Sequence, residues 1–552
     1  MALAPNPEFV PKLITTLGEG YGPSALRADA LAGLTVAIVA LPLSMAIAIA
    51  SGVPPATGLV TAIVGGFLVS ALGGSRFQIG GPAGAFIVLV SSTVATQGIQ
   101  GLVLATLLSG GMLAALGLLR LGTYVKFIPF PVTVGFTAGI GTIIFASQIK
   151  PLLGLTLSGP EPGALVPKLK ALGGAIGTAS PATCALSLGC ILALLALKRW
   201  RPRWPRMLIV VAAAAFLAWA AALPVDTIFS VFGALPAGLP APQLPSLSLD
   251  AVTAALPTAV SFTLLGAIES LLSAVVADGM TGRRHRSNTE LIAQGVANIG
   301  SALFGGIPVT GTIARTATNV RAGAHGPVSG MLHSVFLLVF LMVAAPLAGF
   351  IPLAALAAVL ALVAWDMVEK PAFAALTRAS WGDAAVLYVT LLLTVFRDVA
   401  TAITVGFALG AALFIHRMSS AVEVESDRED PIDEAQASDP QVLIYRISGA
   451  IFFGAVSAVA TVLERIGDQH RVLVIDLTDV TLVDSSAANM IEGLAHKAER
   501  RGVAVYLTGT TPELRRSFMT HGARPPLVRY TRTVDRALEM ARRRGQLAPA
   551  AA

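Results

Sequence analysis

The sequence predicts a polytopic α-helical membrane protein followed by a small α/β domain. Three observations predict this fold class: the composition, the regular recurrence of apolar segments, and a change of character near Val422. Of the 552 residues, 55% are hydrophobic and 12% are charged, with a mean hydropathy of +0.76. Soluble domains carry about 25% charged residues. We therefore expect most of the chain to lie in lipid.

Fourteen segments account for the predicted membrane part. Most of them approach the roughly 20 apolar residues that span a bilayer as a helix. Two, 82–96 and 310–322, are too short or too polar to span alone. The remaining twelve are 31–50, 56–72, 101–119, 131–149, 181–198, 207–223, 257–277, 289–306, 327–345, 352–368, 383–397 and 398–416.

The charges of the loops predict the orientation of these segments. The long loop from Pro224 to Leu256 has no Lys or Arg. The basic loop residues all fall on the other side of the predicted membrane: Arg120, Lys126, Lys198 to Arg203, Arg283 to Arg286, Lys370, Arg378 and His416-Arg417. Positive loops stay in the cytoplasm, so both termini are expected there, in a multi-pass protein of the inner (plasma) membrane. The net charge of +7 is explained by this asymmetry and predicts no nucleic-acid partner.

The domain boundaries follow from the same reading. Residues 1–28 form a cytoplasmic N-terminal segment without a signal-peptide pattern, and 29–418 form the transmembrane transport domain. Residues 419–440 are an acidic, solvated linker, 441–546 the α/β domain, and 547–552 a disordered tail. In the α/β domain, strand-like runs at 442–447, 472–477 and 503–507 alternate with helical patterns at 455–466, 487–500, 511–521 and 533–543. Such alternation indicates a mostly parallel sheet.

A polar stretch with a cation interrupts the tenth segment. Thr310 is a candidate N-cap after a Gly-Pro break, and Arg315 then lies about one turn into the helix. An arginine at membrane depth is costly, so it usually faces a cavity and serves a ligand. The unpaired N–H groups and partial positive charge of a helix N-terminus add to it. The stretch predicts an anion site.

A second break occurs seven segments earlier, in the third segment. Pro82 suits the first helical position, and Gly80, Gly81 and Gly84 allow close approach of a ligand or another backbone. Corresponding breaks in two halves are typical of inverted-repeat transporters, whose half-helix N-termini meet near the membrane midplane. An ordinary Gly-Pro loop is the competing interpretation. We predict a 7+7 inverted repeat with an anion held between the two breaks.

Glu269 is the second buried charge of interest. It lies in an apolar run with no cation within one helical turn in sequence. A lone carboxylate in a low-dielectric site favours its protonated form, so this residue is predicted to couple transport to protons. The alternative is a structural partner for Arg315, and both roles are compatible. His333, within another segment, is interpreted as a packed residue.

These motifs resemble the SulP (sulfate permease) family of anion transporters with a C-terminal STAS domain. The most specific pieces are Val39 to Ala46, Leu264 to Gly282 and Ile313 to Val320, and the resemblance covers nearly the whole chain. It implies a core and a gate, and often a homodimer. The site residues that it implies are Leu43 and Ile47 from the first helix, Gly81, Ala83, Gly84, Ala85 and Phe86 from the third, Glu269 from the eighth, and Thr310, Gly311, Thr312, Ile313, Ala314 and Arg315 from the tenth.

Leu43 and Glu269 refine the predicted substrate and coupling ion. Many eukaryotic members have Gln in place of Leu43, whereas bacterial members similar to C4-dicarboxylate carriers have an aliphatic residue there. Sodium-dependent bicarbonate members resemble the pattern with Asp near position 269, so Glu269 favours protons. The resemblance therefore favours proton-coupled uptake of a C4-dicarboxylate such as fumarate or succinate. Sulfate or bicarbonate transport and an anion channel are the alternatives.

The STAS domain suggests a regulatory site. Val483 to Ala487 is similar to the loop of anti-sigma-factor antagonists, in which a serine matching Ser486 is phosphorylated; a plain N-cap serine is the alternative. This domain also predicts a cytoplasmic protein partner. An enzyme is not expected, because no nucleophile–base set emerges. No cofactor or metal is predicted, and Cys184 and Cys190 are interpreted as small core or lipid-facing residues.

Overall fold

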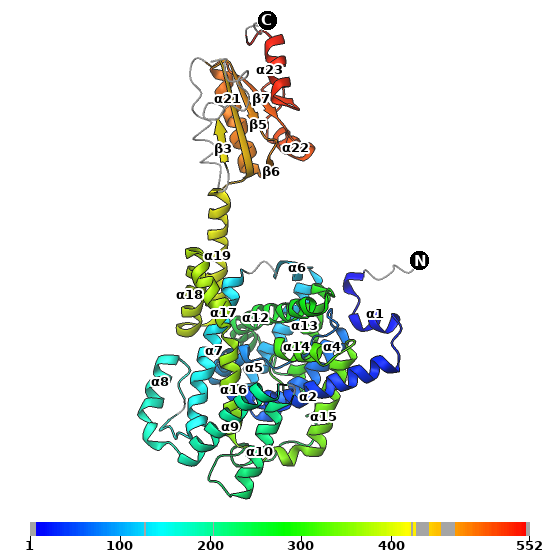
Figure 1. The fold of residues 1–552 in the computed structure, drawn as a ribbon, viewed down its shortest axis with the longest axis vertical. Coiled ribbons are helices and arrows are strands. Elements are labelled where there is room, and N and C mark those ends of the chain that lie inside the picture. The colour runs from blue at the N-terminus through cyan, green and yellow to red at the C-terminus, as the bar shows by residue number, and fades with distance from the viewer. Residues whose placement is uncertain are drawn as a thin grey trace. The chain divides into compact units, whose positions relative to one another are not determined.

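The computed structural model describes residues 7–125, 129–159, 161–202, 204–420, 423–426, 441–453 and 470–547. The chain divides into two compact units, 1–407 and 408–552, which we describe separately (Figure 1). The first unit is helical and the second contains the main sheet. This division agrees with the predicted membrane protein followed by a small α/β domain.

Helices build the first unit. Among the described residues, eight helical stretches are long and apolar enough to cross a membrane, and two shorter apolar helices accompany them. In chain order the helices are α1 (Lys12–Gly18), α2 (Pro23–Ala50), α3 (Pro55–Val60), the π-helix η2 (Thr61–Gly65), α4 (Gly66–Leu72), the 3-10 helix η3 (Gly84–Phe86), α5 (Ile87–Leu118), α6 (Gly122–Val125), α7 (Phe130–Leu153), α8 (Leu165–Gly174), α9 (Pro181–Trp200), α10 (Arg206–Ala220), α11 (Ile228–Phe232), α12 (Leu249–Thr281), α13 (Ser287–Leu303), α14 (Ile313–Arg321), α15 (Val328–Ala348), α16 (Leu353–Met367), α17 (Lys370–Ala379), α18 (Trp381–Phe396) and α19 (Val399–Ser420), which continues into the second unit.

Every one of the fourteen predicted segments falls on a helix. The third and fourth lie within the continuous assignment of α5, which kinks at Gly98, where φ is +69°. The predicted helix starts are less accurate. Helix α2 begins at Pro23 rather than 31, so it includes residues assigned to the N-terminal segment, and α12 begins at Leu249 rather than 257. Polar first turns, which hydropathy misses, explain both differences.

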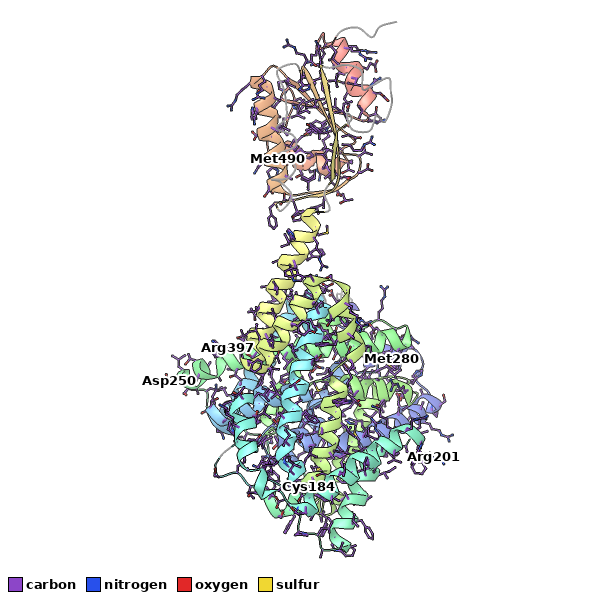
Figure 2. The ribbon with its side chains drawn as sticks, turned by 60° about the vertical axis from the view of Figure 1, so that its left-hand side comes forward. Cys184, Arg201, Asp250, Met280, Arg397 and Met490 are labelled. Carbon is purple, nitrogen blue, oxygen red and sulfur yellow. The ribbon has the colours of Figure 1, made fainter. Side chains whose placement is uncertain are left out.

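The outer surface of this unit suits a lipid environment. Along α9, the exposed side chains of Leu188, Leu192 and Leu195 recur at helical spacing, and their exposed fractions are 58%, 56% and 44%. Apolar residues in such a stripe are what a helix presents to lipid tails. Charged side chains such as Arg201 and Asp250 lie beyond the end of α9 and at the start of α12, where they extend from the surface (Figure 2).

Small residues let the helices of this unit pack closely. A Cβ atom on Gly110 of α5 would lie 2.7 Å from the carbonyl oxygen of Gly295, and one on Gly295 of α13 would lie 2.6 Å from the amide nitrogen of Ala114. Neither position therefore has room for a side chain. Close backbone contact through small residues is the usual packing mode in membranes. It places α13 directly against α5, which follows the first predicted break.

The second unit contains a sheet of mostly parallel strands. Its order is β3-β4-β5-β7-β8, with β6 paired to β4 and only β3 antiparallel. The strands are β3 (Glu423–Ser426), β4 (Val442–Ile451), β5 (Val472–Asp476), β6 (Val480–Val483), β7 (Ala504–Thr508) and β8 (Val528–Thr531), and the described helices after β6 are α21 (Ser485–Arg500), α22 (Pro512–Thr520) and α23 (Val534–Arg543).

Helices cover both faces of this sheet. Leu473 and Ile475 of β5 pack in the same apolar cluster as α21 and α22, whereas Val472 and Val474 pack with α23. This alternation is the period of two that a strand imposes. The parallel sheet and the helices at 487–500, 511–521 and 533–543 confirm the prediction.

Three parts of the α/β prediction differ from the structure or lie outside the described residues. Strand β3 forms within the stretch predicted to be a solvated linker, because its backbone pairs with β4; the linker prediction is wrong for these four residues. Strands β6 and β8 have four residues each, too few for a clear apolar run. The helix predicted at 455–466 lies outside the described residues, as do most of the linker and the tail.

Candidate functional site

The two predicted breaks lie side by side. Strand β1 (Gly80–Gly81) and strand β2 (Thr310–Gly311) pair antiparallel, with Gly80 opposite Gly311 and Gly81 opposite Thr310. The pair is reinforced where the amide and the hydroxyl of Thr312 both donate to the carbonyl of Ile79, at 3.0 and 3.1 Å. Segments 230 residues apart in sequence are thus joined by backbone hydrogen bonds, as the inverted-repeat interpretation requires.

Each break leads into a helix, and both helices begin later in the chain than the sequence predicted. Helical geometry begins at Gly84 in the first break and at Ile313 in the second. Pro82 is therefore not a first helical residue. Thr310 is not the N-cap, since it pairs with Gly81; Thr312 holds that position without capping through its side chain. The two-residue β ladder delays both helix starts.

Both helix starts present unpaired amide groups. Within the described residues, the amide N–H groups of Ala83, Gly84 and Ala85 and those of Ile313, Ala314 and Arg315 donate to no acceptor. Ile313 is 37% exposed and Ala314 is exposed as well, so the first turn of α14 borders open space. Unpaired N–H groups at a helix start attract anions. The two starts together form a candidate anion site.

Arg315 lies behind this site rather than in open space. Its side chain is among the largest fully buried ones, at 1% exposure. Nη2 donates to the hydroxyl of Ser44 on α2 at 3.2 Å and to the carbonyl of Pro82 at 3.3 Å, whereas Nε and Nη1 have no partner in the described part of the chain. The guanidinium also occupies the space that a Cβ atom on Gly81 would need. The expectation that Arg315 faces a cavity is wrong, because its side chain is enclosed by the protein behind the two helix starts.

Helix α12 borders the site along one face. Gly266 accepts a hydrogen bond from the Thr310 hydroxyl at 3.2 Å, and Ser273 donates to Thr316 at 3.0 Å. Glu269 lies between these two contacts, one turn from each, and is 8% exposed. No described residue donates a hydrogen bond to its carboxylate or forms an ion pair with it. Glu269 is therefore not the partner of Arg315.

The remaining predicted residues pack around the two starts. Leu43 and Ile47 flank Ser44 on α2 and are buried in the apolar cluster that also contains Ala83, Ala85 and Phe86. Phe86 additionally meets Phe262 of α12 edge to face, with ring centroids 5.7 Å apart. The structure thus gathers α2, both breaks and α12 in one place.

A polar stripe lies on α13, and two of its members, Glu290 and Asn298, hydrogen-bond the chain at the two breaks; the sequence reasoning missed it. Glu290, Gln294 and Asn298 are spaced four residues apart and are buried. Asn298 bonds both backbone groups of Val309, at 2.9 Å each, just before β2. Glu290 and Gln294 share a hydrogen bond of 3.1 Å. Polar residues at helical spacing in an otherwise apolar segment were the available signal.

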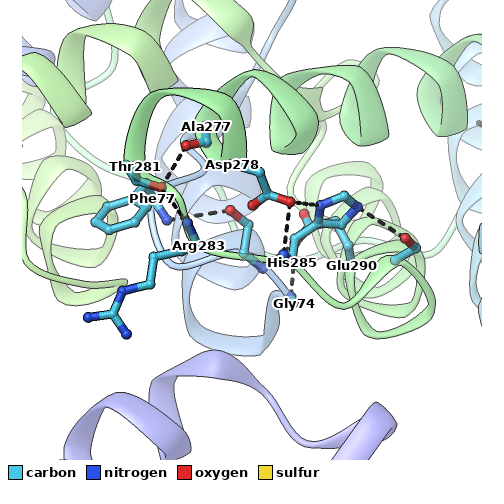
Figure 3. A network of polar contacts seen from close by, with 10 residues as sticks. Gly74, Phe77, Ala277, Asp278, Thr281, Arg283, His285 and Glu290 are labelled. Atoms are coloured by element: carbon cyan, nitrogen blue, oxygen red, sulfur yellow. Dashed lines mark hydrogen bonds and ion pairs between the residues drawn. The ribbon is translucent and has the colours of Figure 1, made fainter.

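The loop between α12 and α13 closes this region at one end. Asp278 accepts from the amide of His285 at 3.0 Å and lies 2.6 Å from its Nδ1, and His285 Nε2 lies 3.0 Å from the hydroxyl of Ser287 (Figure 3). The same view shows Gly74 and Glu290 directly beside this loop. Asp278 lies in the last turn of α12.

A cavity of about 1060 Å³ approaches the site from where α7 and α18 end. Its lining includes Lys150, Lys168 and Arg397, and it reaches Ala46 and Ile87, the neighbours of the predicted site residues Ile47 and Phe86. Lys168 is paired with Glu161 at 2.9 Å. Among the residues that the structure describes, no group of three His, Cys, Asp or Glu side chains could hold a metal ion.

The structure also shows the surroundings of His333 and Ser486, the other two residues interpreted from the sequence. His333 of α15 is fully buried, and neither ring nitrogen has a partner within the described ranges. Ser486 is exposed in the first turn of α21, where Asp484 is the N-cap and accepts from the amide of Ala487 at 2.9 Å. Ser486 is therefore not an N-cap serine.

Comparison with known proteins identifies this arrangement. Residues 26–390 match the Sulfate permease family, and residues 436–537 match the STAS domain. The chain belongs to the sulfate permease family. Its members are transporters rather than enzymes, so the chain is an anion transporter with several membrane-spanning helices.

Individual relatives agree with this assignment. The putative sulfate transporter YvdB of Bacillus subtilis is 37% identical over 89% of this chain and 93% of its own length. The bicarbonate transporter BicA of Synechocystis is 32% identical over 89% of both chains. The transmembrane domain of a cyanobacterial BicA superposes with a TM-score of 0.63 at 33% identity, covering 69% of this chain and 97% of that one. Murine Slc26a9 shares the fold, with a TM-score of 0.86 at 18% identity over 98% and 96% of the two chains.

Proposed function

We propose that this sulfate permease family member is a secondary active transporter of a small inorganic oxyanion, bicarbonate or sulfate. The single observation that carries the proposal is the meeting of two helix starts, with six unpaired amide N–H groups, beside the buried cation of Arg315. The anion is held at residues Gly81 to Phe86 and Thr310 to Arg315. Leu43, Ile47 and Glu269 complete its surroundings.

The charges around the site connect the anion to a coupling ion. Each helix start contributes about half a positive charge, and Arg315 contributes a full one. With Glu269 ionised, the site carries a charge of about +1, and with Glu269 protonated, about +2. A proton on Glu269 therefore strengthens anion binding, and proton-coupled uptake follows. This role is supported by the carboxylate of Glu269, to which no described residue donates a hydrogen bond.

The substrate class rests on the names of the relatives. They are called sulfate and bicarbonate transporters, and none of those that we compared is named for a C4-dicarboxylate. The earlier preference for fumarate or succinate, which rested on Leu43, therefore becomes the competing outcome of the substrate test. The proposal keeps both termini in the cytoplasm and the protein in the inner membrane as a homodimer, as the loop charges and the family resemblance predict.

Uptake into proteoliposomes tests the substrate. Labelled sulfate, labelled bicarbonate and labelled fumarate are offered separately. Each is competed with unlabelled sulfate, bicarbonate, fumarate and succinate, and protein-free liposomes control for leakage of CO₂. We expect saturable uptake of an inorganic oxyanion that fumarate does not inhibit. Uptake of fumarate alone would overturn the substrate proposal, and large currents without saturation would indicate a channel.

Replacement of Arg315 tests the site. We expect Arg315→Ala to raise the KM for the anion by about 10- to 100-fold, since a tenfold change in affinity corresponds to about 1.4 kcal/mol. Ser44→Ala, which removes one acceptor but keeps the cation, should raise KM less. An unchanged KM in folded Arg315→Ala would exclude the proposed site.

A further inference from the structure

Glu290 is surrounded by hydrogen-bond donors. Its Oε2 accepts from the amides of Gly74 and Ser75, at 2.9 and 3.0 Å, and its Oε1 accepts from the side chains of Gln78 and Gln294, at 2.9 and 3.1 Å. A carboxylate offers about four acceptor positions, so its capacity is filled. The side chain is fully buried and lies in the first turn of α13, where a negative charge is favourable.

Three of these four donors belong to the chain that leads into the first break. Gly74 and Ser75 follow α4, and Gln78 directly precedes Ile79 and β1. The backbone here has no room to shift: a Cβ atom on Gly74 would overlap Arg286 and come within 3.0 Å of the Glu290 amide nitrogen. Figure 3 shows Gly74 near Glu290, at the start of α13. Glu290 therefore fixes where this chain crosses α13.

Gln78 connects Glu290 to both breaks. Its Nε2 donates to Glu290 and also to Ser270 of α12, at 2.9 Å each, and Ser270 is the neighbour of Glu269. The same amide group occupies the space where a Cβ atom on Gly311 would lie, directly beneath β2. One side chain thus touches α12, α13 and the second break while its backbone enters the first.

We propose that Glu290 is a positioning residue for the anion site and acts through Gln78. It sets the register of β1 against β2, and with it the direction of the free amides at Gly84 and Ile313. Glu290 itself meets neither anion nor proton, because its acceptor capacity is filled by the protein. The transport readout of this inference rests on the proposed function, whereas its structural readout does not.

The test compares two changes that nearly preserve side-chain size, one at Glu290 and one at its donor Gln294. In Glu290→Gln the new amide nitrogen takes the place of Oε1 or of Oε2. It then faces the Nε2 groups of Gln78 and Gln294 or the backbone amides of Gly74 and Ser75, so donor opposes donor in either case. Gln294→Met removes a hydrogen bond from the same Oε1, whereas Gln294 forms no hydrogen bond with residues 74–81. Both variants lose buried hydrogen bonding, but only the first disturbs the path to the breaks. A double variant, Gln78→Glu with Glu290→Gln, exchanges carboxylate and amide and restores a donor–acceptor pair between positions 78 and 290. The Gln294 amide then turns, so that its oxygen, which has no partner among the described residues, accepts from the new amide.

Two measurements on the full-length protein are made for each variant. Hydrogen–deuterium exchange of peptides covering 76–86 and 305–319 reports the position of the breaks, and the KM and maximal rate for sulfate and for bicarbonate report the site. We expect Glu290→Gln to speed exchange in both peptides and to raise KM about tenfold with a smaller change in maximal rate. Gln294→Met should leave both peptides and KM unchanged, and the double variant should recover most of the wild-type KM.

The outcomes separate this inference from the proposed function. If Glu290→Gln and Gln294→Met change exchange and KM equally, Glu290 has only a general structural role and the inference is wrong. If the wild-type protein moves neither sulfate nor bicarbonate, the proposed substrate fails, and the exchange pattern still decides the inference. Where Glu290→Gln does not fold, the folded double variant with wild-type exchange supports it, and failure of both to fold overturns it.

Discussion

Glu269 and Glu290 are both buried carboxylates on neighbouring helices, yet their surroundings are opposite. Glu290 accepts four hydrogen bonds and joins α13 to the first break. Glu269 receives none from the described residues, although Ser270, the next residue on α12, is bonded to Gln78. Burial alone does not distinguish the two. The difference teaches that a buried carboxylate can have all its acceptor positions filled by the protein or keep them open, and the proposed proton coupling depends on the open ones of Glu269.

The largest expected effect is a difference in stability between two single variants, Glu290→Ala and Glu269→Ala. Glu290→Ala leaves four donors without an acceptor, and an unsatisfied buried polar group costs about 1–3 kcal/mol, so we expect a loss of several kcal/mol and a strong fall in the melting temperature of the purified protein. Glu269→Ala strands no donor and should lower the melting temperature little. Equal shifts for the two variants would contradict the comparison.

The next effect concerns coupling. Glu269→Gln keeps the size of the side chain but cannot change its charge, so we expect an imposed inward proton gradient to lose its acceleration of anion uptake into proteoliposomes, by at least about tenfold, while exchange without a gradient persists. The physical reason is that a proton on Glu269 changes the charge of the site by one unit. Full gradient-driven accumulation by this variant would show that the proton binds elsewhere. Gln294→Met serves as the control for a buried change on the neighbouring helix.

A smaller contrast exists within the first break. A Cβ atom on Gly81 would overlap the guanidinium of Arg315, whereas one on Gly84 would meet Met367 and Ile144 at ordinary distances of 3.5 and 3.6 Å. We expect Gly81→Ala to displace Arg315 and raise the KM for the anion about tenfold, and Gly84→Ala to change it less than about threefold, by the usual relation between affinity and free energy. Kinetic measurements on both variants check this prediction. A larger rise of KM in Gly84→Ala than in Gly81→Ala would show that displacing Arg315 does not weaken anion binding.

The smallest effect extends the comparison to a third carboxylate, outside the membrane. Burial works to raise the pKa of Asp476, but hydrogen bonds from Thr478, Arg446 and Thr508 outweigh it and hold the pKa below its usual range. The lowered pKa means that Asp476 stabilises the STAS domain above the unfolded-state pKa of about 3.9. This contribution is lost as the pH falls through the still lower folded-state value.

Asp476→Asn tests this sign. We expect it to lower the stability of the STAS domain by about 1–3 kcal/mol at neutral pH, the range for hydrogen bonds to a charged group. Pepsin cleavage of the full-length protein between pH 5 and pH 2 should then show a difference between the variant and the wild type that shrinks toward low pH. A difference that grows toward low pH would mean that the pKa is raised instead.

The sequence predicted the positions of the site better than its geometry. Thr310, Pro82 and Arg315 were recognised as parts of two breaks, because Gly, Pro and a cation are unusual in apolar segments. The helix starts were predicted two residues early, since no local signal predicts a two-residue ladder whose partner strand is about 230 residues away in sequence. For the same reason Arg315 was expected in open space, although Ser44 and the carbonyl of Pro82 hold it inside the protein.

The sequence by itself determined the fourteen helical segments, the α/β domain and the family, because hydropathy, periodicity and motifs are properties of neighbouring residues. Only the tertiary structure decided which buried charges are partnered. Glu269 and Glu290 each stand in an apolar segment, and the donors that distinguish them come from Gly74, Ser75 and Gln78, more than 200 residues earlier in the chain. A hydrogen bond depends on distance in space, which the folded chain alone sets.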